Sequence, residues 1–300
     1  MLRKIFKGFG YFLLGLIVIL AAAYVYLAMQ TGEKAPERAV FAREKSPFLV
    51  FAHRGGGGLY PENTLGAFEY SAKMGADVLE LDVHATSDGV LVVMHDGSVD
   101  RTTNGKGRVS AMTLAELKKL DAGYLFTNDN SATYPFRGQG ITIPTLQEIF
   151  DRLPQITFNI EPKQAEPSIT APLCEMIRAH KMTEKVIVGS FRQQAIDEFR
   201  QACPEVATSA TPAEVAEFLT LSKTGLSESY NPPFQALQVP ENLNRLSVVT
   251  KDFVENAHRK NIKVHVWTIN EPADMQRLIK IDVDGIMTDY PDRLLKLLGR

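Results

Sequence analysis

The sequence predicts an α/β fold, a (β/α)8 TIM barrel preceded by one N-terminal transmembrane helix. Short runs rich in Val, Ile, Leu and Phe alternate with helical patterns, which is typical of parallel βα units. Eight such units can be placed along the 300-residue chain. About 250 residues remain after the N-terminal segment, a usual size for this barrel. The sequence lacks the glycine-rich motif that begins the first helix of a dinucleotide-binding fold.

Residues 1–29 are predicted to anchor the chain in a membrane. An uncharged, mostly apolar stretch runs from Phe9 to Met29, and a bilayer span needs about 20 such residues. Arg3, Lys4 and Lys7 precede it, so the positive-inside rule keeps the N-terminus in the cytoplasm. We therefore expect the remainder of the chain on the extracytoplasmic side.

A cleaved signal peptide is the alternative, because Ala21, Ala22 and Ala23 offer a small-residue cleavage site. The apolar run continues past that site to Met29, which favours an uncleaved anchor. Residues 30–47 are polar, contain two prolines and lack periodicity, so they are predicted to be a linker. Residues 48–300 are then predicted to form the barrel.

Each predicted barrel strand is a short apolar run bounded by polar residues, Gly or Pro. In chain order the strands are Phe48–Ala52, Asp77–Val83, Ile156–Ile160, Lys185–Val188, Val206–Thr208, Ala236–Val239, Val264–Thr268 and Gly285–Thr288, with Val90–Met94 extending or following the second. Helical periodicity predicts helices between and after them. These are Thr64–Met74, Ile169–Ala179, Gln193–Ala202, Ala213–Leu221, Asp252–Lys260, Ala273–Ile279 and Asp292–Leu298.

The segment Gly97–Ile143 breaks this alternation and is predicted to be an insertion after the second strand. It is polar and contains one short helical pattern, Leu114–Leu120. A connection this long in a compact domain is usually a lid or a binding excursion. Its aromatic residues are expected to form either a groove for an acyl chain or a small satellite core; they are Tyr124, Phe126, Tyr134 and Phe136.

Charged side chains cluster where the first three strands end, which places them on one face of a barrel. Glu80 and Asp82 share a face of the second strand because side chains alternate. Glu161, at the end of the third strand, can complete a set of three carboxylates. Such oxygen ligands suit a hard divalent cation, so a metal site is predicted here.

Two histidines and two cations accompany these carboxylates. His53 and Arg54 end the first strand, His95 follows Val90–Met94, and Lys163 lies two residues after Glu161. This set suits cleavage of a phosphate ester. The cation polarises the phosphoryl oxygens, Arg54 and Lys163 balance the phosphate charge, and the two histidines exchange protons with the nucleophile and the leaving alkoxide.

Five motifs resemble the glycerophosphodiester phosphodiesterase family, in its order and spacing. They are HRGGGGLYPENT (53–64), ELDVHATSDGVLVVMHD (80–96), NIEPK (159–163), VWTIN (266–270) and DGIMTDYPD (284–292). The resemblance implies a barrel that hydrolyses glycerophosphodiesters to an alcohol and glycerol 3-phosphate. It also implies attack by the substrate's own glycerol hydroxyl through a cyclic phosphate.

By this resemblance His53 and His95 are the acid/base pair, and Glu80, Asp82 and Glu161 bind Mg²⁺ or Ca²⁺. Arg54 and Lys163 would hold the phosphate. One alternative is a lysophospholipase D acting on membrane lysophospholipids, which an anchor and the insertion aromatics would serve. The non-enzymatic alternative is a lipid-binding barrel, which the complete set of candidate catalytic groups disfavours.

Other residues have less specific readings. Trp267 ends the seventh strand and is expected either to offer substrate an apolar wall or to pack in the core. His265 is expected to pack below it, and His84 to be an ordinary loop histidine more often than a functional one. Asn63 is expected to cap the first helix. Gly55–Gly58 are expected to permit a tight turn beside the phosphate.

The composition limits the partners. The 33 basic and 35 acidic residues nearly cancel, so bulk charge gives no reason to expect nucleic-acid binding. Cys174 and Cys203 lack zinc-ligand and redox-motif spacing. They can pair outside the cytosol if their Cα atoms lie within about 7 Å, but two separate packing thiols are expected. Ser222–Phe234 joins a helix to the sixth strand, so it is expected on the face opposite the site.

Overall fold

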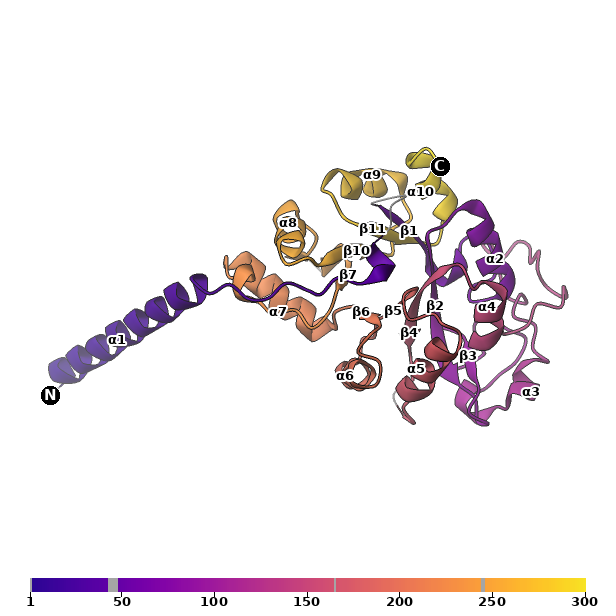
Figure 1. Cartoon of the computed structure of the whole chain (residues 1–300), viewed down its shortest axis with the longest axis horizontal. Coiled ribbons are helices and arrows are strands. Elements are labelled where there is room, and N and C mark those ends of the chain that lie inside the picture. Colours follow the sequence, from indigo (N-terminus) through magenta and orange to yellow (C-terminus); the bar gives the residue numbers. More distant parts are fainter. Residues whose placement is uncertain (1, 43–47, 165, 244–245) are drawn as a thin grey trace.

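The chain folds into a nearly closed barrel of eight parallel strands, which confirms the predicted fold class (Figure 1). The computed structural model describes residues 2–42, 48–164, 166–243 and 246–300, and only the backbone of residues 2–8 and 10. The barrel strands, in spatial order, are β6 (Ala207–Thr208), β5 (Val186–Val188), β4 (Thr157–Pro162), β2 (Val78–Ala85), β1 (Leu49–Ala52), β11 (Gly285–Thr288), β10 (Lys263–Trp267) and β7 (Ala236–Pro240). A parallel bridge between Ser209 and Ala236 joins the two ends of this series.

Helices surround the strands as a ring (Figure 1). They are α2 (Leu65–Met74), α4 (Leu146–Arg152), α5 (Thr170–Ala179), α6 (Gln193–Ala202), α7 (Pro212–Lys223), α8 (Lys251–Arg259), α9 (Pro272–Lys280) and α10 (Pro291–Leu297). Seven of these match predicted helices. The eighth, α4, has no counterpart in the prediction, although Thr145 and Glu148 form a reciprocal capping box at its start.

The segment after β2 leaves the barrel before the chain returns to it at β4. Strand β3 (Leu91–Val93) pairs antiparallel with β2 and lies outside the barrel order. A single helical turn, α3 (Leu114–Leu117), occupies part of the predicted helix at 114–120. A satellite core does fold this region, but aliphatic side chains such as Val92, Val99 and Leu117 build it.

The prediction of two separate thiols is wrong, because Cys174 and Cys203 form a disulfide with a Cα–Cα distance of 5.8 Å. Cys174 lies on α5, and Cys203 directly follows α6. These two helices follow neighbouring strands, so they pack side by side around the barrel. The pairing is a product of barrel topology, and a spacing of 29 residues carries no signal of it.

Helix α1 (Leu2–Ala28) projects away from the barrel (Figure 1). Residues Tyr11–Ala28 form the one helix among the described residues that is long and apolar enough to cross a membrane, with a mean hydropathy of 2.3 and no buried residues. The Tyr24 hydroxyl donates a hydrogen bond to the Thr224 carbonyl of the barrel, 2.9 Å away. By length and composition, this helix is a candidate membrane anchor or signal sequence.

Two residues of the predicted linker are buried against the barrel. Ala35 and Val40 are 3% exposed. Val40 packs with the first residues of three strands, Leu49, Val78 and Ala207. Residues 43–47, the end of the predicted linker, lie outside the described residues. Residues 32–41 therefore cover the floor of the barrel, at the N-terminal ends of its strands.

Because Val40 seals this floor, the Val40→Ala substitution should destabilise the barrel. Removing two buried methyl groups costs about 1.5 kcal/mol of unfolding free energy. Denaturant unfolding of the full chain in detergent measures this change. Leu246→Ala is the control, because Leu246 is 44% exposed and its truncation should change stability by less than about 0.5 kcal/mol. Equal shifts in both variants would contradict the sealing role of Val40.

Candidate active site

The predicted carboxylates lie on two neighbouring strands, with Glu80 and Asp82 within β2 and Glu161 near the C-terminal end of β4. In the β2–β4 pairing, Glu80 is opposite Asn159 and Asp82 is opposite Glu161. Glu80 and Asp82 are 5% and 1% exposed. Glu161 is partly buried, with 16% of its side chain exposed. The acidic groups thus sit in a largely buried space, and burial of like charges raises the free energy of the ionised state.

The pKa values follow from this crowding. Burial, with Asp82 next in importance, raises the pKa of Glu80 to about 7. Burial likewise raises the pKa of Glu161, against the opposing effect of Lys163. The pKa of Asp82 is instead lowered, because Lys163 and His95, among other partners, outweigh its burial. The site therefore favours any cation that can approach these oxygens.

Lys163 is the cation that this structure places there. Its Nζ lies 2.8 Å from Glu161 Oε2 and 3.1 Å from Asp82 Oδ1, so it bridges two of the three predicted metal ligands. Asp82 is further oriented by Asn63, whose Nδ2 donates to Asp82 Oδ2 at 2.9 Å. The prediction that Asn63 caps α2 is wrong. The cap is Thr64, whose side chain accepts from the Ala67 amide.

Arg54 lies in a tight turn directly after β1. Its φ of 51° and ψ of 32° are left-handed, as are those of Gly56, and Gly55 has a φ of 82°. A Cβ on Gly55 would lie 2.9 Å from the Ala67 side chain, so a glycine is required there. The turn directs the Arg54 amide to Glu80 Oε2, 2.7 Å away. The predicted tight turn at the first glycines is confirmed.

His53 is held by a partner that the sequence analysis did not identify. Its Nδ1 lies 2.7 Å from Asp289 Oδ1, and Asp289 Oδ2 accepts from Asn270 Nδ2 at 2.7 Å. Burial lowers the pKa of His53. The hydrogen bond to Asp289 and the nearby charge of Glu80 raise this pKa by more than burial lowers it, so the net shift is upward. Asp289 follows β11, so the strand-end rule used for Glu161 would have found it.

His95 has the same kind of partner. Its Nδ1 lies 2.7 Å from Asp96 Oδ1, and Asp96 Oδ2 accepts from Arg101 Nε at 2.6 Å. Burial lowers the pKa of His95 more than Asp82 and Asp96 raise it. In both histidines a carboxylate fixes Nδ1, which leaves Nε2 as the nitrogen available to a substrate.

Arg101 connects the insertion to both halves of this cluster. Besides Asp96, it donates to Glu62 Oε1 and Oε2 at 2.7 and 2.8 Å. Glu62 in turn accepts from Arg54 Nη1 at 3.1 Å. Glu62 therefore positions two arginines. Arg101 was not identified from the sequence, because neither its residue type nor its spacing marks it as the partner of Asp96 and Glu62.

An aromatic pair borders the cluster. Trp267 is half-buried and its ring meets that of Phe191 edge-on, with the ring centroids 5.7 Å apart. Phe191 is 58% exposed, and Lys163 Nζ lies 5.9 Å from the centre of its ring. Trp267 also packs against the barrel-interior cluster that contains Phe51. Both expected roles of Trp267, wall and core, thus have a physical basis here.

The remaining histidines differ in role. His265 is fully buried against Phe51, as expected, and burial lowers its pKa to about 4, so it is neutral. His84 is 8% exposed and its Nε2 lies 3.2 Å from the His95 carbonyl. His84 is therefore no exposed loop residue. It fixes the backbone that carries His95.

The four insertion aromatics are half-exposed and pair with one another or with Arg137. Arg137 lies over the rings of Tyr124 and Tyr134, 4.1 and 3.9 Å from their centres. A hollow of about 460 Å³ beside Tyr124 is lined by charged side chains as well as by Leu120 and Ile141; the charged ones are Lys118, Lys119, Asp121 and Arg137. Basic side chains at such a hollow do not suit an acyl chain.

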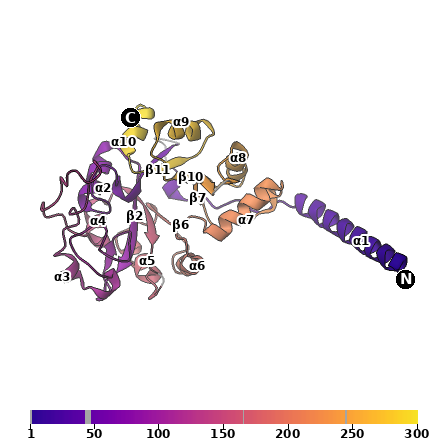
Figure 2. The same cartoon turned by 180° about the vertical axis from the view of Figure 1, so that it is seen from behind.

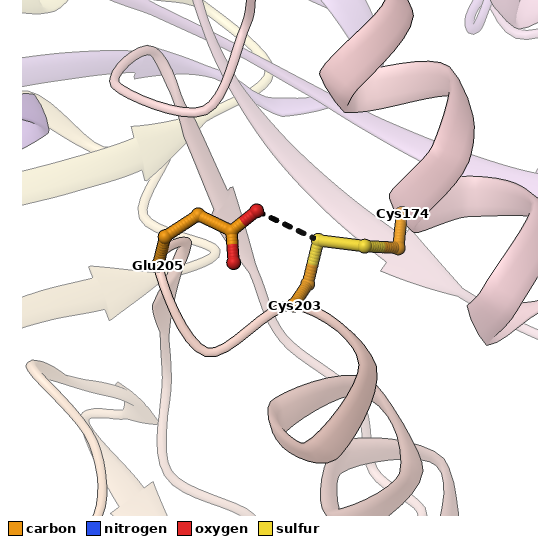
Figure 3. A group of neighbouring side chains, drawn as sticks. All are labelled: Cys174, Cys203 and Glu205. Carbon is orange, nitrogen blue, oxygen red and sulfur yellow. Dashed lines mark hydrogen bonds between the residues drawn. A yellow bond between two sulfur atoms is a disulfide. The ribbon is translucent and has the colours of Figure 1, made fainter.

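Among the described residues, the ligand atoms of Cys174, Cys203 and Glu205 lie within 4.8 Å of one another, as a bound metal ion would require. Figure 3 shows the two sulfur atoms bonded to each other, with a Glu205 oxygen 3.8 Å from the Cys203 sulfur. Metal ligation by cysteine requires a thiolate, so the disulfide removes this group from consideration.

Comparison with known proteins agrees with this geometry. The model of the "Glycerophosphoryl diester phosphodiesterase family" matches residues 53–293. A glycerophosphodiester phosphodiesterase of Caldanaerobacter subterraneus subsp. tengcongensis is 36% identical, over 84% of this chain and 98% of its own. Mouse lysophospholipase D is 27% identical, over 86% and 88%.

Among solved structures, a phosphodiesterase of Oleispira antarctica in complex with the product sn-glycerol 3-phosphate superposes with a TM-score of 0.66. It is 26% identical, and the match covers 84% of this chain and 97% of the other. Fold, strand-end motifs and sequence identity thus agree along most of the chain, and this chain belongs to the glycerophosphoryl diester phosphodiesterase family.

Proposed function

We propose that this enzyme hydrolyses glycerophosphodiesters to an alcohol and glycerol 3-phosphate with a divalent cation and the His53–His95 pair. The observation that carries the proposal is the joint placement of two carboxylate-held histidines and three carboxylates on β2 and β4, two of them buried. The family relationship supports the substrate class, and the bound product of the Oleispira antarctica relative supports the product.

Glu80, Asp82 and Glu161 would hold the cation, Mg²⁺ or Ca²⁺. The fit rests on the donors themselves, because hard cations prefer carboxylate oxygens and a Lys163 ammonium already bridges two of these groups. When bound, the cation supplies Lewis-acid polarisation of the phosphoryl group and lowers the pKa of an attacking hydroxyl. Lys163 then has to share its carboxylate partners with the cation.

Arg54 is the strongest candidate to hold the substrate phosphate. Its Nε is buried without a hydrogen-bond partner and lies 3.7 Å from Asp82 Oδ2. A guanidinium can donate two parallel hydrogen bonds to a phosphate, and Glu62 fixes one end of this one. Lys163 supplies a second positive charge beside the phosphate, as the sequence analysis predicted.

The opposite pKa shifts of the two histidines support opposite roles. His95, whose pKa is lowered, takes the proton from the glycerol hydroxyl as that oxygen attacks phosphorus. His53, whose pKa is raised, donates a proton to the alkoxide that leaves. Water then opens the cyclic phosphate with the two roles reversed. Trp267 and Phe191 offer the leaving alcohol an apolar wall.

The proposed location is a membrane, with α1 as an uncleaved anchor and the barrel on the extracytoplasmic side. The apolar, unburied α1 supports the anchor, and three basic residues before the span support the orientation. The disulfide supports an oxidising compartment. A lysophospholipase D activity is the second candidate, favoured by the mouse relative.

Removal of the cation should abolish activity. EDTA is expected to stop release of glycerol 3-phosphate from glycerophosphocholine, and added Mg²⁺ or Ca²⁺ should restore it, because without the cation the carboxylates repel the phosphate and its oxygens are not polarised. An enzyme-coupled glycerol 3-phosphate assay measures both steps. Full turnover in chelator would refute the metal role while leaving the substrate assignment intact.

Loss of either histidine should lower turnover by roughly 10²–10⁴-fold, the usual contribution of a general acid or base. His53→Ala and His95→Ala are compared with His180→Ala, whose side chain contacts Met176 and Asp151 away from the site. His180→Ala should retain near-normal turnover with all substrates.

The assignment of roles is tested with a glycerophosphoryl p-nitrophenyl ester, whose leaving group needs no proton. This ester should recover most of the turnover lost in His53→Ala and none of that lost in His95→Ala. Recovery in His95→Ala instead would reverse the two roles.

In cells that express the full chain, Cys174 and Cys203 should resist thiol-blocking reagents until they are reduced, because an extracytoplasmic barrel keeps its disulfide. The intact chain should also stay in the membrane pellet after an alkaline wash. Thiols that react without reduction would place the barrel in the cytoplasm, and a soluble chain lacking residues 1–29 would establish cleavage.

A further inference from the structure

The segment that follows α1 is fixed to loops on the N-terminal face of the barrel. The Gly32 amide donates to the Glu228 carbonyl at 2.7 Å, and the Ala35 amide donates to the Lys260 carbonyl at 2.9 Å. Glu228 lies before β7 and Lys260 before β10, so both loops belong to the face opposite the site. The prediction that 222–234 lies there is confirmed.

Two further contacts hold the same segment. Lys260 is 1% exposed and donates through Nζ to the Gly32 carbonyl at 2.7 Å. Arg38 donates to the carbonyl of Pro204, in the loop before β6, at 2.6 Å. A buried ammonium that loses a carbonyl partner is costly, so the chain from Gly32 to Val40 is part of the barrel and is no flexible tether.

Only residues 29–31 remain between this fixed segment and the end of α1 at Ala28. Three residues extend over roughly 10 Å at most. The folded part is on the order of 40 Å across for about 250 residues. If α1 spans a bilayer, the α7 side of the barrel floor therefore stays close to the membrane surface, as the Tyr24–Thr224 contact also indicates.

The site lies far from this attachment in two directions. Along the barrel, Asp82 is four residues beyond Val78 at the floor, which is roughly 13 Å of strand. Around the barrel, β1 and β2 are diametrically opposite β6 and β7 in the closed order. Figure 2 shows α1 leaving beside α7, on the side away from α2, α4 and the insertion.

We propose that the anchor holds the active site away from its own bilayer, so that the enzyme cleaves water-soluble glycerophosphodiesters and not lysophospholipids embedded in that bilayer. The proposal rests on the proposed function and names its substrate class. A lysophospholipid keeps its phosphate at the membrane surface, where this site does not reach.

The test uses the full chain reconstituted in bilayer vesicles, where two substrates release the same product, choline. Dissolved glycerophosphocholine should be cleaved as fast as in detergent solution. Long-chain lysophosphatidylcholine in the same bilayer should be cleaved at least about 100-fold more slowly. A matched variant carries a flexible Gly-Ser insert of about 30 residues between Gln30 and Thr31, which spans roughly 30 Å on average.

This longer tether should leave turnover of glycerophosphocholine unchanged and raise that of the embedded lysolipid at least tenfold. Comparable cleavage of both substrates by the natural chain would overturn the proposal, as would an insert variant without any gain on lysolipid. A chain that leaves glycerophosphocholine intact even in detergent would overturn the proposed function, and the substrate claim with it.

Orientation is measured separately by energy transfer to acceptor-labelled lipids. A donor dye at Glu37→Cys, on the floor segment, should transfer strongly, and one at Asn128→Cys, in the insertion, weakly. Both positions are exposed, and the native cysteines are bonded to each other, so labelling is specific. Equal transfer from both dyes would contradict the orientation whatever the activity.

Discussion

The crowding of three carboxylates in a largely buried space on β2 and β4 is the constraint on which this site depends. Glu80, Asp82 and Glu161 cannot all ionise in a buried space without compensating positive charge. In the structure that charge comes from Lys163 and, at a longer distance, from Arg54. A site that needs positive charge in this way is poised to take up a divalent cation.

The surrounding polar groups serve to orient this charge. Asp289 and Asp96 each fix the Nδ1 of one histidine, and Asn270 and Arg101 fix those two carboxylates in turn. Such second partners set the ring orientation of a general acid or base. Arg101 comes from the insertion, so the segment that leaves the barrel also completes the support of the site.

Much of this arrangement was predictable because strand ends in a barrel share one face. That rule predicts from the sequence that four side chains lie together, those of His53, Glu80, Asp82 and Glu161. The apolar runs predict the eight strands. Partnerships between distant segments were not predictable. His53 and Asp289 are 236 residues apart, and neither residue type nor spacing marks them as a pair. The disulfide was missed for the same reason.

Two other omissions have different causes. The capping-box residues Thr145 and Glu148 are a sequence signal for the start of α4. The helix has only seven residues, which is too few for a clear helical repeat of apolar residues. Val40 is an isolated apolar residue in a polar stretch, so composition indicated a linker. Its burial at the barrel floor follows only from the space that the strands leave there, and this burial fixes the anchor relative to the site.

The central claim is that the buried carboxylates form a cation site, and calorimetric titration of the metal-stripped full chain with Ca²⁺ or Mg²⁺ tests it most directly. We predict binding of about one ion per chain. Glu161→Gln should weaken this binding strongly. Glu205→Gln, which changes the carboxylate beside the disulfide, should leave it unchanged. Absence of binding, or equal affinity in both variants, would contradict the account.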